Sequence, residues 1–272
     1  MSWIDLKTHR TETLLALTLI GLSLMIGVAN PVFFTADNLL EILRNGTVFG
    51  ILAVGAMLAL ISGGIDVSFT AIAVFSLYAT TKILPATGYE GNILLGFLLA
   101  GIIGLTLGTF NAFFIALFRL PTLIVTLGTL SLFRGFLLSF IGSDYITVLP
   151  AGMVEFSRWT LWEGTTDAGA TYRLPAAFLL LVVVVVATAL ILRYTMLGRG
   201  IYALGGSEEA ARRAGFNIRG LHFFIYGYVG LLSGLAGLVH ASLNRMANPF
   251  DLVGTELNVI AAVVLGGARL TG

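Results

Sequence analysis

The stretch LGRGIYALGGSEEAARRAGFNIRGL, residues 197–221, is the most polar interval of an otherwise apolar chain. Two glycines precede a serine, a residue type that favours the N-cap of a helix. Two glutamates and then two arginines follow, the order that the helix dipole favours, and a glycine supplies the stop. The stretch predicts a helix of about two turns between two membrane spans. Its residues are Gly205, Ser207, Glu208, Glu209, Ala210, Ala211, Arg212, Arg213, Ala214 and Gly215.

Two interpretations of this polar interval stay open. Arginine-rich loops are the usual mark of the cytoplasmic side, so the interval is either a solvated loop that caps well or a helix that docks on a soluble partner. From Arg193 to Arg219 it carries five basic and two acidic residues. A short helix gains little stability alone, so its strong capping favours the docking helix.

The composition is that of a membrane protein and excludes several kinds of site. Of 272 residues, 57% are hydrophobic and only 11% charged, against about a quarter charged in soluble domains. There is no cysteine, which excludes disulfides and thiolate metal ligands. No phosphate-binding G-x-x-x-x-G-K-[ST] motif and no G-x-S-x-G motif occurs, and the histidines lack ligand spacing. We therefore predict no catalytic residue, no metal site and no nucleic-acid partner.

The apolar runs predict one all-α polytopic membrane domain over residues 1–272. A helix needs about twenty mostly apolar residues to cross the bilayer. We expect eight spans, the eighth incomplete, at residues 13–29, 46–62, 65–83, 93–118, 122–141, 175–192 and 221–240, with the last beginning at 256. Arg134 interrupts the fifth. The apolar run before Thr271 and Gly272 is too short for a finished span, which suggests that the chain continues.

Loop charges predict the orientation. The positive interval around Arg212 is expected inside, and the acidic interval 142–174, which includes Asp144, Glu163 and Asp167, is expected outside. Counting back places the amino terminus in the cytoplasm.

Polar residues within the spans are candidates for a translocation pathway. Asp66 follows Gly63 and Gly64, which break the apolar run, and it either caps the next helix, with Ser68 in its first turn, or has a functional role. Hydroxyls and amides can bind a polar solute, but they also form hydrogen bonds between helices. The pathway candidates are Asp66, Ser68, Asn111, Thr126 and Thr129; Thr106, Thr109 and Ser131 are weighed beside them.

Glycines recur on two of the expected spans at spacings that place them on one face. They predict close helix packing, or faces that slide past each other during transport. These glycines are Gly96, Gly101, Gly104 and Gly108 on one span and Gly227, Gly230, Gly234 and Gly237 on the other.

Four stretches resemble a known family in its order along the chain: SGGIDVSFTAI (62–72), PTLIVTLGTLSLFRG (121–135), LGRGIYALGGSEEAARRAGFNIRGLHFFIYGYVGLLSGLAG (197–237) and ELNVIAAVVLGGARLTG (256–272). They look like the permease subunits of ATP-binding-cassette (ABC) sugar importers of the ribose type, whose members include autoinducer-2 permeases. The resemblance implies a multi-pass permease of the bacterial inner membrane that imports a monosaccharide or small polyol by alternating access. It also implies that residues 205–215 form the coupling helix, through which the ATPase moves the permease.

The same resemblance implies partners. ATP and Mg²⁺ are expected on a separate ATPase, whose two nucleotide-binding halves are often fused. A second permease copy or close paralogue and an extracytoplasmic sugar-binding protein complete the assembly, and family members continue by roughly two more spans. The alternatives are a secondary transporter driven by an ion gradient and an intramembrane enzyme. The first needs paired carboxylates or broken helices near mid-membrane, where only Asp66 qualifies. The second needs a convergent set of acids, bases or ligands, and the sequence shows none.

Overall fold

The computed structural model describes residues 3–89, 91–165 and 171–269, and in the first helix it describes side chains from Thr13 onward. Asp167, Thr271 and Gly272, which carried expectations above, lie outside the described residues.

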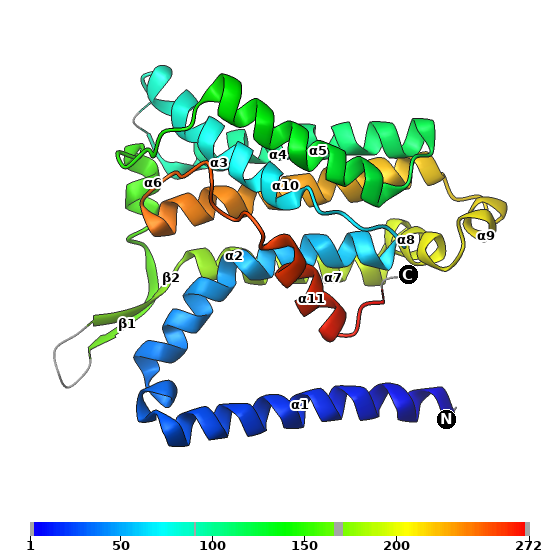
Figure 1. Cartoon of the computed structure of the whole chain (residues 1–272), viewed down its shortest axis with the longest axis horizontal. Helices are drawn as coiled ribbons and strands as arrows, with labels where there is room; N and C mark the ends of the chain where they lie inside the picture. Colours follow the sequence, from blue (N-terminus) through cyan, green and yellow to red (C-terminus); the bar gives the residue numbers. More distant parts are fainter. Residues whose placement is uncertain (1–2, 90, 166–170, 270–272) are drawn as a thin grey trace.

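The described residues form a bundle of long helices with one small hairpin (Figure 1). The elements are α1 (Trp3–Ala29), the 3-10 turn η1 (Pro31–Phe34), α2 (Ala36–Ile61), α3 (Phe69–Ala86), α4 (Ile93–Phe118), α5 (Thr122–Phe136), the π-helical turn η2 (Leu137–Ile141), α6 (Ala151–Phe156), β1 (Thr160–Thr165), β2 (Thr171–Pro175), α7 (Ala177–Tyr194), α8 (Met196–Gly206), α9 (Glu208–Arg213), α10 (Ile218–Asn244) and α11 (Glu256–Leu265).

Six of the described helices are long and apolar enough to cross a membrane: α2, α3, α4, α5 continued through η2, α7 and α10. Two more apolar helices are shorter, at Thr13–Ala29 and Glu256–Leu265. The prediction of a helical polytopic membrane protein is confirmed. The predicted count of eight spans is reached only if both shorter helices also enter the membrane.

Polar side chains set where these helices begin. Thr35 caps α2, Asn92 caps α4 and Asn217 caps α10, each accepting a hydrogen bond from a backbone N–H in the first turn. Arg119 ends α4 and Arg245 ends α10, both with a left-handed backbone conformation. The fourth and fifth spans have the bounds that the sequence predicted, and cap and stop residues directly flank the fourth.

The core of the bundle is α10, which packs against α4, α3 and α2. The glycine faces predicted from the sequence meet here. A β-carbon on Gly104 would lie 2.2 Å from the carbonyl oxygen of Gly230, and one on Gly230 would lie 2.2 Å from the carbonyl oxygen of Gly104. The backbones of α4 and α10 are therefore in direct contact, so close packing is confirmed. Gly237 packs in the same way on Ala73 of α3.

Several predicted helix boundaries were wrong, because contacts with distant parts of the chain also decide where these helices begin and end. The second span does not begin at Gly46, since α2 begins ten residues earlier at Ala36. The third helix does not begin at Ile65. The chain is non-helical from Gly64 to Ser68, and α3 begins at Phe69. Residues 196–206, for which no separate helix was predicted, form α8.

The polar interval 142–174 is also more ordered than its sequence indicated. It contains α6 and the antiparallel pair β1–β2, in which Glu163 pairs with Arg173. A backbone bridge between Ile146 and Ala247 ties this interval to the loop after α10. Strand pairing is a non-local contact, and the alternation in these short strands was too weak to predict it.

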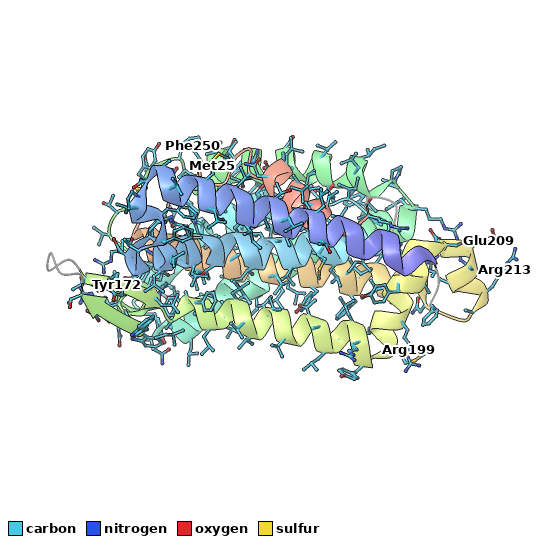
Figure 2. The ribbon with its side chains drawn as sticks, turned by 90° about the horizontal axis from the view of Figure 1, so that it is seen from below. Met25, Tyr172, Arg199, Glu209, Arg213 and Phe250 are labelled. Atoms are coloured by element: carbon cyan, nitrogen blue, oxygen red, sulfur yellow. The ribbon has the colours of Figure 1, made fainter. Side chains whose placement is uncertain are left out.

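The molecule has two ends, separated by the length of the bundle. Figure 2 places Glu209 and Arg213 at one end, which we call the α9 end, and Tyr172 at the other, which we call the hairpin end. The start of α1 lies toward the α9 end, and α1 itself runs apart from the bundle (Figure 1). Its apolar side chains are exposed, with Val28 87% exposed.

Candidate functional site

The α9 helix has the caps that the sequence predicted. Ser207 Oγ accepts a hydrogen bond from the Ala210 N–H at 3.2 Å. At the other end the N–H of Gly215 donates to the Arg212 carbonyl at 3.0 Å, and the N–H of Phe216 donates to the Ala211 carbonyl at 3.1 Å. These two bonds, with Gly215 at φ +88°, form a Schellman motif. The serine cap, the acidic first turn, the basic last turn and the glycine stop read from 205–215 are therefore present, whereas Gly205 and Gly206 belong to α8.

One face of α9 is anchored and the other is exposed. Ala211 is 1% exposed and packs in an apolar cluster with Leu204 of α8 and Leu221 of α10. The outer face carries the ion pairs Glu208–Arg212 and Glu209–Arg213. Exposed pairs of this kind contribute only about 0.3–0.5 kcal/mol each. The outer surface of α9 is therefore charged, rigidly backed and unoccupied by any described part of the chain.

The α8–α9 segment touches the non-helical residues 62–68 between α2 and α3, which we call the break. A β-carbon on Gly63, whose φ is +77°, would lie 3.5 Å from the Cα of Gly205. The backbone of α8 thus lies close to the backbone of the break, at the α9 end of the molecule.

Asp66, Ser68 and Asn111 form one buried polar cluster at that break. Asp66 Oδ1 accepts hydrogen bonds from the Ser68 N–H and the Ser68 hydroxyl, both at 2.7 Å. Asn111 Nδ2, from α4, donates to Ser68 Oγ at 2.7 Å. Asp66 thus bonds to a backbone N–H just before the helix, as the capping interpretation expected. Ser68, which that interpretation placed in the first turn, instead precedes α3, because the helix begins at Phe69. Asp66 Oδ2 and Asn111 Oδ1 have no hydrogen-bond partner in the described structure.

Threonines of α5 hold the other side of the break. Thr126 Oγ1 donates to the Ile65 carbonyl at 3.2 Å and accepts from the Val67 N–H at 3.3 Å. Thr122 Oγ1 accepts from the Ile65 N–H at 3.0 Å. Thr129 bonds only to its own helix, at the Thr126 carbonyl. The five pathway candidates from the sequence are therefore all buried around one segment, and Thr126 satisfies its backbone groups.

The remaining polar candidates lie elsewhere. Thr106 and Ser131 are exposed and Thr109 is partly buried, and each donates to a carbonyl of its own helix. They take no part in the cluster at the break.

A second polar group within the bundle was missed by the sequence reasoning. Glu256, at the start of α11, forms an ion pair with Arg134 of α5 and accepts a hydrogen bond from Thr70 of α3 at 2.6 Å. The Glu256 side chain is 9% exposed and that of Arg134 is 23% exposed. The available signal was Arg134 itself, because a cation inside an apolar span predicts a buried partner of opposite charge.

We expect the substitution Glu256→Ala to destabilise the protein by about 3–5 kcal/mol, because it leaves the Arg134 cation uncompensated among apolar helices. Arg134→Ala should cost a similar amount. The double variant Arg134→Met/Glu256→Leu should be more stable than either single variant, since no unpaired charge remains. Thermal unfolding in detergent measures this order, and a double variant less stable than both singles would contradict it.

No group of three or more His, Cys, Asp or Glu side chains in the described part of the chain could hold a metal ion.

Comparison with known proteins gives the family. The profile of a family described as "Branched-chain amino acid transport system / permease component" matches residues 38–272. The ribose import permease protein of Escherichia coli strain K12 is 34% identical over 258 residues, covering 94% of this chain and 77% of the relative. The autoinducer 2 import system permease protein of Yersinia enterocolitica is 31% identical over 271 residues, covering 100% and 71%.

A third relative, the L-arabinose ABC transporter permease protein of Azospirillum brasilense, is 34% identical over 247 residues, covering 89% of this chain and 68% of the relative. No solved structure gives a significant match. The profile match extends over α9, the break and the Arg134–Glu256 pair. The chain therefore belongs to this family of transport-system permease components.

Proposed function

We propose that this chain is the membrane-spanning permease of an ABC importer for a monosaccharide or related small polyol. The observation that carries the proposal is α9, a capped helix that is anchored by Ala211 and presents an otherwise unoccupied charged face. The printed names of the relatives, which concern ribose, L-arabinose and autoinducer 2, favour a small sugar-like solute over an amino acid. ATP and Mg²⁺ bind to a separate ATPase, and this chain hydrolyses nothing.

The α9 end faces the cytoplasm in this proposal, and the hairpin end faces outward. Arginine is concentrated at the α9 end, as expected for cytoplasmic segments. The start of α1 lies toward the same end, which supports a cytoplasmic amino terminus (Figure 1). The two shorter apolar helices, Thr13–Ala29 and Glu256–Leu265, then enter the membrane and bring the count to eight. The membrane is the bacterial inner membrane.

ATP drives transport mechanically. Closure of the ATPase around nucleotide displaces α9, and the backbone contact of Gly205 with Gly63 passes this displacement to the break before α3. The spans then exchange between inward-open and outward-open states. A loaded extracytoplasmic sugar-binding protein selects one of these states, because a partner shifts an equilibrium only by binding one state more tightly.

Among the pathway residues, Asp66 and Asn111 are the best candidates for substrate contact. Each keeps one buried oxygen without a partner, and sugar hydroxyls donate to such acceptors. Ser68 and Thr126 are engaged in holding the break, and Thr129 is bonded to its own helix. The pathway forms with a second permease, either a copy of this chain or a close paralogue.

An ion-gradient-driven secondary transporter is the alternative. It needs acidic groups free to bind and release a coupling ion in the membrane. Glu256 is neutralised by Arg134, which leaves Asp66 as the one carboxylate at the break among the described residues. The relatives' printed names support the ABC importer instead.

The proposal is tested by reconstituting the permease with its ATPase and sugar-binding protein in liposomes. We expect uptake of radiolabelled ribose or arabinose only with ATP on the ATPase side, and none when a hydrolysis-deficient ATPase replaces the active one. Imposed proton and sodium gradients serve as controls and should drive no uptake. Uptake by the permease alone along either gradient would favour the secondary transporter.

A further inference from the structure

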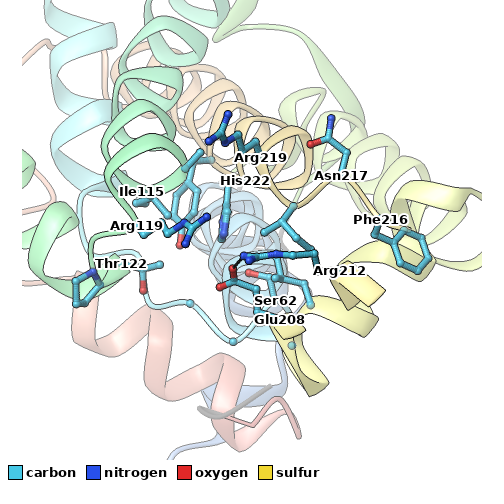
Figure 3. Close-up of a pocket in the computed structure, with 18 of the residues that line it drawn as sticks. Ser62, Ile115, Arg119, Thr122, Glu208, Arg212, Phe216, Asn217, Arg219 and His222 are labelled. Carbon is cyan, nitrogen blue, oxygen red and sulfur yellow. Dashed lines mark hydrogen bonds and ion pairs between the residues drawn. The ribbon is translucent and has the colours of Figure 1, made fainter. Parts of the chain in front are cut away.

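A cavity of about 740 Å³ lies between the break and α9. Gly64, Thr122 and Tyr226 line it on the side of the break, and Glu208 and Arg212 line it on the side of α9. Figure 3 shows side chains from the end of α4, from α9 and from the start of α10 facing this shared space. Volumes of about 300–1,000 Å³ are typical of small-molecule sites, so the cavity is large enough for a ligand of that class.

The cavity has more positive than negative charge. Its lining contains Arg119, Arg212 and Arg219 but only one carboxylate, Glu208. Glu208 is paired with Arg212, and neither of the other two arginines has an ion-pair partner in the described structure. The ion pairs of Arg44, Arg134 and Arg213 lie outside the cavity, and that of Arg212 is the pair with Glu208. Two guanidinium groups are therefore free to bind an anion.

Neutral polar groups in the same cavity also lack partners. His222 Nδ1 is buried and has no hydrogen-bond partner in the described structure, and Arg119 lines the same cavity. The hydroxyl of Tyr226 is buried and has no hydrogen-bond partner among the described residues, and the Thr122 side chain lies close to it. Buried polar groups normally have partners, so these atoms point to a ligand that carries both an anion and hydroxyls.

We propose that this cavity binds the phosphate monoester of a small sugar from the cytoplasm, a proposal that rests on the importer function above. The phosphate, with a charge of about −1.5 to −2 at neutral pH, would lie between Arg119 and Arg219, and the sugar hydroxyls would reach Tyr226 and Thr122. Planar guanidinium groups bind phosphate oxygens in pairs, which gives the site its preference for phosphate over a neutral sugar.

The position of the cavity gives this ligand a regulatory effect. The ligand would connect the end of α4 with the start of α10 beside α9, and so resist movement of α9 relative to the break. It would hold the permease in one state and slow import. A phosphorylated sugar forms when a kinase acts on the imported sugar, so this site would report that the product of import has accumulated.

The test uses the permease–ATPase complex in nanodiscs of phosphatidylcholine, with ribose 5-phosphate, ribose and inorganic phosphate as probes. We expect saturable binding of ribose 5-phosphate by calorimetry, at least about tenfold tighter than binding of either other probe. The variant Arg119→Gln/Arg219→Gln should weaken this binding by about tenfold or more. The matched control Arg193→Gln/Arg199→Gln removes two exposed arginines outside the cavity and should leave binding unchanged.

Import is measured separately, so that failure of the site is distinct from failure of the importer. Liposomes that import ribose with ATP should slow several-fold when ribose 5-phosphate is supplied on the ATPase side, and the Arg119→Gln/Arg219→Gln variant should not slow. Equal binding of ribose or inorganic phosphate would overturn the proposal. So would absent binding in phosphatidylcholine, or binding that phosphatidylglycerol abolishes, because the cavity would then belong to a lipid headgroup.

Discussion

Gly104→Ile should abolish folding of the permease, because the α4 and α10 backbones leave no room for a side chain. Even a β-carbon at residue 104 would lie 2.2 Å from the Gly230 carbonyl oxygen and 3.0 Å from the Gly234 Cα. Backbone atoms cannot rotate away as a side chain can, so the cost should exceed the roughly 1–3 kcal/mol of ordinary overpacking. The measurement is the yield of monodisperse protein after detergent extraction.

The control for this experiment is Gly128→Ile on α5, where a β-carbon would meet nothing within 4 Å. It should give a normal yield. Gly104→Ala separates the two interpretations of the glycine faces. If the alanine variant folds and binds ATPase but does not transport, the faces must also slide. A normal yield and normal transport for Gly104→Ile would contradict the close contact of the two helices.

The triple substitution Glu208→Ala/Glu209→Ala/Arg212→Ala should abolish co-purification with the ATPase while membrane insertion and thermal stability are retained. All three side chains are about half exposed or more, at 49%, 73% and 51%, and their ion pairs contribute little to folding. Docking on a soluble partner instead depends on such a charged surface. Affinity purification through a tag on the permease measures the loss.

A matched control removes the same charges from the hairpin end. Glu155→Ala/Glu163→Ala/Arg173→Ala takes away two acids and one base in the segment around β1 and β2. Because that segment lies far from α9, the control should leave ATPase binding unchanged (Figure 2). Co-purification that the α9 variant leaves intact would refute docking through α9.

The features that could be predicted from the sequence are those set by local chemistry. The caps of α9 depend on Ser207 and Gly215, which lie next to the groups they bind. The bounds of α4 follow from Asn92 and Arg119 at its ends. The glycine faces were visible because their spacing matches the helical period. Each of these inferences needed only residues within a few positions of one another.

The features that could not be predicted depend on contacts between distant parts of the chain. Glu256 and Arg134 are 122 residues apart, and nothing near either residue specifies the other. The hairpin likewise needs two short strands to pair, and the non-helical run up to Ser68 is held by threonines of another helix. No helix was predicted over α8 because its four glycines weaken the helical pattern, although Ile201 and Leu204 form a buried apolar face.

The position and neighbour of α9 in the assembled complex test the central claim most directly. The chain has no cysteine, so Ala210→Cys places one unique thiol on the exposed face of α9. We expect a membrane-impermeant maleimide to label it in inside-out vesicles only, and a short bifunctional reagent to join it to the ATPase. Thr165→Cys at the hairpin end should show the opposite labelling. Labelling of Ala210→Cys from the outer side, or no cross-link to the ATPase in an actively transporting complex, would contradict the account.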